Sequence, residues 1–394
     1  MTTGPRLFTG SGRLLLPEPY DGALPWAILV RDGRIEGVGA RAELAGTDDI
    51  VDLGSALVTP GLVDAHTHPA FLGDRSDEAA ARLAGARYDG GGILRTVAAT
   101  RAASDGDLQA AVETRLRAAL QAGTTTVECK SGYGLTTDEE LRALKIIGAA
   151  AGNVGLRVVR TFLGAHAVPP EASSRGAYAT LVADEMLPAV AAAGLAEFCD
   201  VFCDAGFFTL AEAEQILRSA SAHGLGIRLH ADQLSRTGAA ELGVRLGATS
   251  VDHLEQLDDA GVAALAGSTT VATLLPGPAL VMRDRLPPAR ALIDAGAMVA
   301  LASDANAGTF GTWGAMPLVI GLGATLLGMT IAEAMAAATT GGASALGITG
   351  VHGTIASGAA ADLVAWDAEH EGAFALRLGS VRADRAFVAG EPVA

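Results

Sequence analysis

The first feature able to do chemistry is a pair of histidines that ends an apolar run. His66 and His68 follow "TPGLVDA" with one residue between them. In an extended chain successive side chains point to opposite faces, so both imidazoles would point the same way. Two imidazoles on one face can begin a metal site, or they can be polar residues that close an ordinary strand. The pair alone does not decide between these interpretations.

Polar side chains recur where later apolar runs end. Five of the eight histidines stand at such ends, which a random distribution would not give. We expect His223, His352 and His370, which fall elsewhere, to be ordinary surface or helix residues. The polar residues at the later ends are Lys130 and Ser131, His166, His230 and Gln233, His253 and Glu255, and Asp304 and Asn306.

Four of these side chains would form a metal site if they met. Three nitrogens and one oxygen suit a catalytic Zn²⁺ that keeps a position open for water, with Fe or Mn possible. Such an ion lowers the pKa of a bound water to about 7 and so provides a nucleophile at neutral pH. The sequence therefore predicts a mononuclear hydrolytic centre. Its ligands would be His66, His68, His230 and Asp304.

The elements that would position these residues alternate between apolar runs and alanine-rich helical segments, as in a parallel sheet wrapped by helices. Eight such runs predict a (β/α)8 TIM barrel, in which strand ends and the following loops converge on one rim. The count can be off by one, so an open sheet stays the alternative. Extra helical segments lengthen the first unit over residues 69–122. The runs are "PGLVDAHTH", "TTTVECKSG", "LRVVRTFLGAH", "AEFCDVFCDAG", "GIRLHADQ", "TSVDHLE", "TVATLLPG" and "AMVALASDAN".

Net charge and composition narrow the classes of partner that the protein can have. The 394 residues carry a formal net charge of −16, which argues against nucleic acid or an anionic membrane as the main partner. We expect a small-molecule substrate. Cys129, Cys199 and Cys203 form no even framework, and we expect buried thiols in a reducing cytoplasm. No secretion signal or membrane-spanning run is visible, so a cytoplasmic protein is expected.

Longer motifs carry a resemblance. "PGLVDAHTH" and the closing "GTIASGAAADLVAWD" resemble the amidohydrolase superfamily, whose small β-domain is assembled from both termini. "HTHPAFLGDRSDE", "KSGYGL", "FLGAHAVPPE" and "SDANAG" resemble the imidazolonepropionase family nearly end to end. The resemblance implies a small β-sandwich domain over residues 1–58 and 346–394, beside a barrel over 59–345. It also implies a homodimer.

The reaction that the resemblance implies is hydrolysis of a cyclic amide, 4-imidazolone-5-propanoate, to N-formimidoyl-L-glutamate. The metal would be held by the four ligands predicted above. Two-metal relatives use a bridging carboxylated lysine, and the chain has only two lysines, Lys130 and Lys145. Lys130 is the sole candidate at a strand end and precedes a turn that is typical of a ligand-facing loop. We therefore expect one metal.

The same resemblance assigns the remaining roles. Arg75 would clamp the propionate with help from Tyr88 and Tyr133. Asp304 would move protons between the water and the leaving nitrogen, although the general base is left open. His166 would donate to the carbonyl oxygen. His253 would orient the water or shuttle its proton. The other substrate contacts would be Gln233, Asn306, Gly308 and Thr309.

One position departs from the family pattern. The usual Asn-Pro-Gly is here Asn306-Ala307-Gly308, and losing the proline should loosen a loop that touches substrate. Two other functions stay open: another cyclic amidase or deaminase on the same scaffold, and a non-catalytic descendant. An uncharged base needs no carboxylate clamp such as Arg75, and a non-catalytic descendant usually loses metal ligands.

Overall fold

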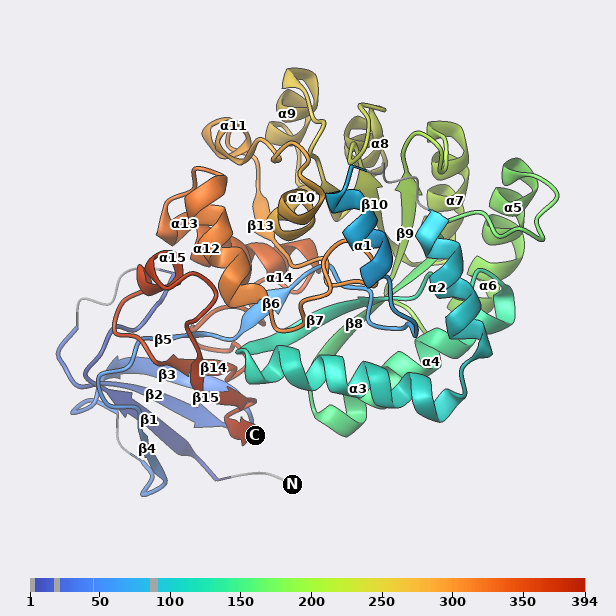
Figure 1. The fold of residues 1–394 in the computed structure, drawn as a ribbon. Coiled ribbons are helices and arrows are strands. Elements are labelled where there is room, and N and C mark those ends of the chain that lie inside the picture. The colour runs from blue at the N-terminus through green and yellow to red at the C-terminus, as the bar shows by residue number, and fades with distance from the viewer. Residues whose placement is uncertain (1–3, 18–21, 45, 86–90, 394) are drawn as a thin grey trace.

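A barrel of eight parallel strands forms the centre of the computed structural model, which describes residues 4–17, 22–44, 46–85 and 91–393 (Figure 1). Each strand lies within one of the eight predicted runs, and the strands are neighbours in chain order from β6 to β13. They are β6 (Leu62–Asp64), β7 (Thr124–Lys130), β8 (Arg157–Ala165), β9 (Phe198–Cys203), β10 (Gly226–Ala231), β11 (Ser250–His253), β12 (Val271–Leu274) and β13 (Val299–Leu301).

The barrel closes just beyond the ends of β6 and β13. Thr67 and Ala305 form a parallel bridge there. The Asp304 amide donates to His66 O (2.9 Å), and the His68 amide donates to Ala305 O (2.9 Å). The sheet is therefore a closed barrel rather than the open alternative. The backbone that closes it carries three of the four predicted metal ligands.

Helices cover the outside of the barrel and follow the strands in sequence (Figure 1). The first unit contains extra helices, as the sequence predicted for residues 69–122. After β6 come α1 (Ser76–Leu83), α2 (Gly91–Ala102) and α3 (Asp105–Gln121), then α4 (Thr137–Val154), α5 (Arg175–Leu181), η1 (Val182–Met186), α6 (Leu187–Ala192), α7 (Leu210–Ala222), α8 (Ala239–Leu246), α9 (Asp259–Ala266), α10 (Pro276–Met282), α11 (Ala289–Asp294), α12 (Met316–Leu326), α13 (Ile331–Ala336), η2 (Ala337–Gly341), α14 (Gly342–Ala345) and α15 (Ala373–Leu376).

Two four-stranded sheets from both ends of the chain lie beside the barrel (Figure 1). Phe8 of one sheet packs edge-on against Phe387 of the other, with ring centroids 4.8 Å apart, in a shared apolar core. A hairpin turn in one of these sheets contains Asp32 (φ 49°) and Gly33 (φ 75°), the left-handed pair that tight hairpins require. The sheets contain β1 (Arg6–Gly10), β2 (Trp26–Arg31), β3 (Arg34–Ala40) and β4 (Ile50–Asp52), and β5 (Val58–Pro60), β14 (Leu363–Trp366), β15 (Ala383–Val388) and β16 (Glu391–Val393).

This arrangement matches the predicted combination of a barrel and a small β-sandwich. The boundaries at 58/59 and 345/346 stay a prediction. Strand β5 pairs with β14 through Pro60, two residues beyond the first of them.

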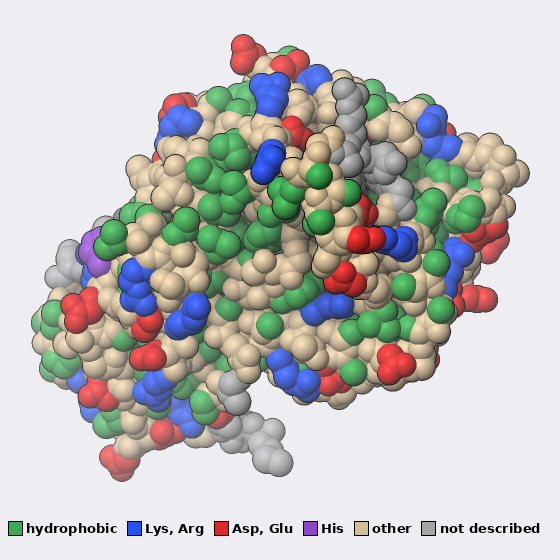
Figure 2. Space-filling view, in the orientation of Figure 1, with side chains coloured by type: hydrophobic (Ala, Val, Ile, Leu, Met, Phe, Trp, Pro, Cys, Tyr) green, Lys and Arg blue, Asp and Glu red, His purple; other side chains and the backbone are tan. Residues whose placement is uncertain are grey.

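Burial separates the histidines into two groups. The five at strand ends are buried, whereas His223 and His370 are exposed and His352 is half-buried. Histidine is accordingly scarce on the face shown in Figure 2, where acidic and basic side chains are interspersed. All three cysteines are buried and unpaired, as expected, and burial raises the pKa of Cys203 to about 12. Within the described residues, no helix is long and apolar enough to cross a membrane.

Candidate active site

The four predicted metal ligands converge at the closed end of the barrel. His66 Nε2 and His68 Nε2 are 3.2 Å apart. Asp304 Oδ1 lies 3.7 Å from the first and 3.4 Å from the second. Potential ligand atoms of His66, His68 and His230 all lie within 4.8 Å of one another. Residues separated by more than 200 positions in the sequence thus present their donor atoms to one small volume.

Two carboxylates behind the cluster orient the imidazoles. His66 Nδ1 lies 2.7 Å from Asp252 Oδ2, and His230 Nδ1 lies 3.0 Å from Asp200 Oδ2. A carboxylate accepts a proton from Nδ1, so the Nε2 lone pair faces the cluster, as in carboxylate–histidine–metal triads. Sequence reasoning missed both aspartates, which stand alone inside apolar strands.

The electrostatics of this cluster fit a bound cation. The Nε2 lone pairs of His66 and His68 face each other across 3.2 Å, an arrangement that a shared positive charge stabilises. Asp304 Oδ1 and His68 Nδ1 are buried and have no hydrogen-bond partner among the described residues. Burial lowers the pKa of both histidines well below its usual value, so they are neutral and ready to bind. The residues present therefore fit a transition metal.

His253 belongs to the same cluster, since potential ligand atoms of His66, His253 and Asp304 all lie within 4.8 Å of one another. Its Nε2 is 3.9 Å from Asp304 Oδ2, and its Nδ1 is 3.4 Å from Glu255 Oε1. Burial opposes a charged imidazole, but the carboxylates of Glu255 and Asp304 outweigh it and raise the pKa of His253. His253 (φ 84°) and Leu254 (φ 71°) have left-handed backbones, a strained conformation that directs the side chain to the site.

Eleven predicted site residues lie in or beside one pocket above the cluster. Ten of them line it, and His66 lies directly beneath it. Gly308 contacts Arg75 instead of the pocket itself. Tyr88 lies outside the described residues. Ile93 of α2 and Phe202 of β9 also line the pocket; both are apolar, so no polar signal in the sequence marked them. The ten are His68, Arg75, Tyr133, His166, His230, Gln233, His253, Asp304, Asn306 and Thr309.

Arg75 reaches the pocket from the residue that precedes α1, and Glu78 fixes its guanidinium. Its Nε and Nη2 donate to the two Glu78 oxygens at 2.9 and 2.8 Å. Arg82 donates to Glu78 Oε1 (2.6 Å) and to Gly308 O (2.6 Å), which ties α1 to the loop after β13. The arginine is thus held in place before any substrate arrives.

The "SGYGL" loop is held by a buried glutamate from α4. Glu140 accepts the backbone N–H groups of Gly132 (3.0 Å), Gly134 (2.9 Å) and Leu135 (2.8 Å). Tyr133 lies between them and packs edge-on against His166, with centroids 5.1 Å apart. His166 Nδ1 donates to Gly132 O (2.9 Å). One carboxylate thereby positions two pocket residues.

The loop after Asp304 keeps its shape without the family proline. Asn306 Oδ1 accepts the backbone N–H groups of Gly308 (2.7 Å) and Thr309 (2.8 Å). Asn306 Nδ2 donates to Asp304 O (2.7 Å) and to Thr309 Oγ1 (2.7 Å). The expected loosening at Ala307 is therefore offset by the Asn306 amide, whose hydrogen bonds shape the loop.

Gln233 lies on the loop after β10, and hydrogen bonds to a residue beyond the neighbouring strand β9 fix this loop. Asp204, just after β9, accepts the backbone N–H groups of Gln233 (3.0 Å) and Leu234 (2.7 Å). The Gln233 amide side chain lines the pocket beside His230.

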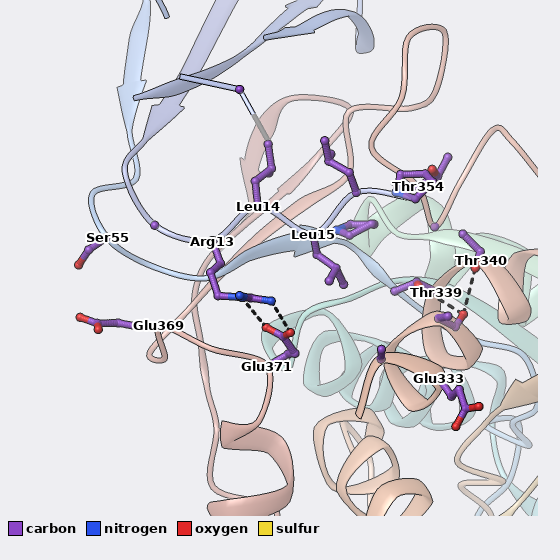
Figure 3. Close-up of a pocket in the computed structure, with 18 of the residues that line it drawn as sticks. Arg13, Leu14, Leu15, Ser55, Glu333, Thr339, Thr340, Thr354, Glu369 and Glu371 are labelled. Atoms are coloured by element: carbon purple, nitrogen blue, oxygen red, sulfur yellow. Dashed lines mark hydrogen bonds and ion pairs between the residues drawn. The ribbon is translucent and has the colours of Figure 1, made fainter. Parts of the chain in front are cut away.

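A larger cavity of about 1060 Å³ lies between the small sheets and α13. In Figure 3 the Arg13 guanidinium turns toward Glu371, while Glu369 points away. The Arg13–Glu371 pair is bidentate, at 2.8 and 2.6 Å. The rest of the lining is mostly leucine, alanine and threonine, with no histidine or cysteine among the described residues. The cavity thus lacks convergent catalytic groups, and the smaller pocket is the candidate active site.

Comparison with known proteins shows to which family the chain belongs. The amidohydrolase family profile matches residues 57–393. The chain belongs to the amidohydrolase family. It is 45% identical to an imidazolonepropionase of Caulobacter vibrioides over 367 residues, covering 89% of this chain and 91% of the relative. It is 47% identical to that of Rubrobacter xylanophilus (90% and 88%) and 42% identical to that of Cupriavidus metallidurans (96% and 95%).

Solved structures share the fold at low identity. A zinc-bound adenosine deaminase from Xanthomonas campestris aligns with a TM-score of 0.72 at 21% identity, covering 98% of this chain and 92% of that chain. A 5-methylcytosine deaminase from Klebsiella pneumoniae aligns with a TM-score of 0.77 at 16% identity, covering 98% of both. These alignments support the barrel and its small sheets.

Proposed function

We propose that this protein is an imidazolonepropionase, which hydrolyses 4-imidazolone-5-propanoate to N-formimidoyl-L-glutamate. The observation that carries the proposal is 42–47% identity to imidazolonepropionases over about nine-tenths of the chain. The pocket supports it, because one face offers metal ligands and another offers an arginine for a carboxylate.

His66, His68, His230 and Asp304 would hold one metal ion, for which we propose zinc, with iron as the alternative. Mixed nitrogen and oxygen donors accept both. When bound, the ion supplies Lewis-acid activation of water and of the ring carbonyl. Metal analysis of the purified protein distinguishes the two ions.

Arg75 and Tyr133 would bind the propionate. Glu78 holds the Arg75 guanidinium at the pocket wall, where it can pair with a carboxylate. Gly308 allows the guanidinium to lie flat against the loop after β13. A neutral nucleobase would leave this arginine without a carboxylate partner from the substrate, so the deaminase alternative is disfavoured.

Asp304 and His253 would move protons. Asp304 takes a proton from the attacking water and passes it to the leaving ring nitrogen. His253, whose raised pKa favours the protonated form, donates to the oxygen that gains negative charge, in addition to orienting the water. A buried donor that meets this oxygen as its charge develops would stabilise the transition state more than the ground state.

His166 would take a different part from the one that the sequence predicted. Gly132 O can only accept, so the proton of His166 is on Nδ1. Burial lowers the pKa of His166, so the ring is neutral and Nε2 is an acceptor. We therefore assign it to a ring N–H of the substrate rather than to the carbonyl oxygen. Gln233 would hydrogen-bond the ring from the opposite wall.

The direct test follows the absorbance of enzymatically generated imidazolonepropionate. Metal-loaded protein should accelerate its loss far beyond the spontaneous decay and release N-formimidoyl-L-glutamate. Decay at the spontaneous rate, with deamination of a nucleobase instead, would assign the pocket to the alternative reaction.

The resemblance implies the assembly, and the location is the one expected from the sequence. We propose a homodimer in the cytoplasm that acts on a small molecule. Sedimentation equilibrium measures the first, and cell fractionation measures the second.

A further inference from the structure

Beneath the metal cluster, the Lys130 side chain lies among three buried carboxylates. The ammonium is 2.7 Å from Glu128 Oε1, 2.8 Å from Asp200 Oδ2 and 3.9 Å from Asp252 Oδ2. All four side chains have 0% exposure. Lys130 does not line the pocket. The turn after it, which the sequence indicated as a ligand-facing loop, carries the pocket residue Tyr133.

Two of the three carboxylates contact predicted metal ligands. Asp252 lies 2.7 Å from His66 Nδ1, and Asp200 lies 3.0 Å from His230 Nδ1. Asp200 Oδ1 also accepts the His230 backbone N–H (3.1 Å).

Glu128 hydrogen-bonds to the backbone of Thr67, which lies between His66 and His68. Its Oε2 accepts the Thr67 backbone N–H (3.1 Å), while the Lys130 amide donates to Thr67 O (3.0 Å). The ammonium thus lies within 4 Å of three carboxylates, which in turn contact His66, His230 and the backbone of Thr67.

Three fully buried carboxylates repel one another unless cations lie between them. The Lys130 ammonium is one such cation. Arg228 supplies another cation, but its Nη atoms bind Asp252 (3.0 Å) and the carbonyls of Ala65 and Ala345. Asp200 is paired with Lys130.

A carboxylated Lys130 does not fit this site. Carboxylation would replace the ammonium with an anion among three carboxylates and would leave a single N–H where the cation now pairs with Glu128 and Asp200. The nitrogen is therefore committed to positioning, which agrees with a single metal.

We propose that Lys130 is a positioning residue for the metal site: through Asp200, Asp252 and Glu128 it holds the histidine ligands in their binding orientation. The proposal rests on the proposed metal-dependent function. Removal of such outer partners typically lowers metal affinity about 10–100-fold. The loss should therefore appear in metal binding itself, and not only in turnover.

The test is a double-variant cycle with Lys130→Met, Asp200→Asn and the combination. Zn²⁺ affinity is measured by competition with a chelator, and Co²⁺ absorption reports ligand geometry. Each single variant should bind Zn²⁺ about 10–100-fold more weakly and shift the Co²⁺ spectrum. The combination removes one charge of each sign, so it keeps the charge balance where a single variant fails to fold. Because both residues act through one path, it should lie within about threefold of the weaker single variant.

Lys145→Met is the matched control, because it makes the same change at the exposed second lysine. It should leave affinity and spectrum unchanged. Wild-type affinity and spectrum in a folded Lys130→Met variant, or in the combination, would overturn the proposal. Losses that multiply in the combination would also overturn it, since they would show independent action. Failure of the wild-type protein to bind Zn²⁺ or Co²⁺ would instead refute the proposed function.

Discussion

Gly308 lies directly against the guanidinium of Arg75. A Cβ at this position would be 2.3 Å from Arg75 Cζ and 2.4 Å from Nη1. The loop after β13, which carries Asp304, therefore sets the position of the arginine that we assign to the substrate carboxylate. One short loop therefore positions both Asp304, a predicted metal ligand, and Arg75, which we assign to the substrate carboxylate.

Gly308→Ala should displace the Arg75 side chain. Losing a charge-assisted hydrogen bond costs about 1.5–3 kcal/mol, so kcat/KM should fall about 10–100-fold, mainly through KM. Steady-state kinetics on imidazolonepropionate measures this. Gly311→Ala is the control in the same loop, since its Cβ would meet only Asn306 O, at 3.8 Å. An unchanged KM in Gly308→Ala would mean that Arg75 does not bind the substrate.

The barrel and the convergence of the four predicted ligands could be predicted from the sequence for one physical reason. Strand periodicity marks eight buried runs, and the topology of a closed barrel brings all their ends to one rim. His230 and Asp304 could thus be assigned without knowledge of their distance. The family assignment, made on longer motifs, is also confirmed.

The carboxylates behind the ligands could not be found in that way. Asp252 reaches His66 from a different strand, and which residues face each other depends on the register between strands, such as the pairing of His230 with Asp252. One sequence does not contain that register. A lone acidic residue inside an apolar strand was the available signal, because burying an unpaired carboxylate is unfavourable.

Glu140→Gln should loosen the loop that carries Tyr133. A glutamine turns an N–H₂ group toward backbone donors that a carboxylate now accepts, leaving at least one unsatisfied. The free energy of unfolding should fall by about 1–3 kcal/mol in urea titrations, and kcat/KM should fall about tenfold. Glu139→Gln is the control, because Glu139 pairs with Arg142 near the surface and should cost about 0–1 kcal/mol. Equal effects of both variants would contradict the role of Glu140.

Amine labelling should separate the two lysines. Reductive methylation of the native protein should modify Lys145, which is exposed, and spare Lys130, which is buried and bonded to Glu128 and Asp200. Peptide mass spectrometry measures both sites, with the unfolded protein as the control in which both react. Methylation of Lys130 in the native protein would contradict its burial.

The metal-free protein should lose stability as the pH falls below the usual histidine value. Burial lowers the pKa of His66, His68 and His166 well below 6.5, so the unfolded state binds more protons than the folded state there. Each such imidazole contributes at most about 1.4 kcal/mol per pH unit to the loss below about pH 6.5. Their contribution is fully present above that value. His253, with a raised pKa, adds stability as the pH falls toward about 6.5 and adds no slope below it.

Urea denaturation of chelator-treated protein between about pH 5 and 7 measures this slope. His166→Gln should reduce it, because one neutral imidazole is removed, whereas His223→Gln, at an exposed position, should leave it unchanged. Bound metal should flatten the same curve, since it favours the deprotonated ligands of the folded state. A slope that His166→Gln leaves unaltered would show that this imidazole is protonated in the folded protein, and its assignment as an acceptor would be wrong.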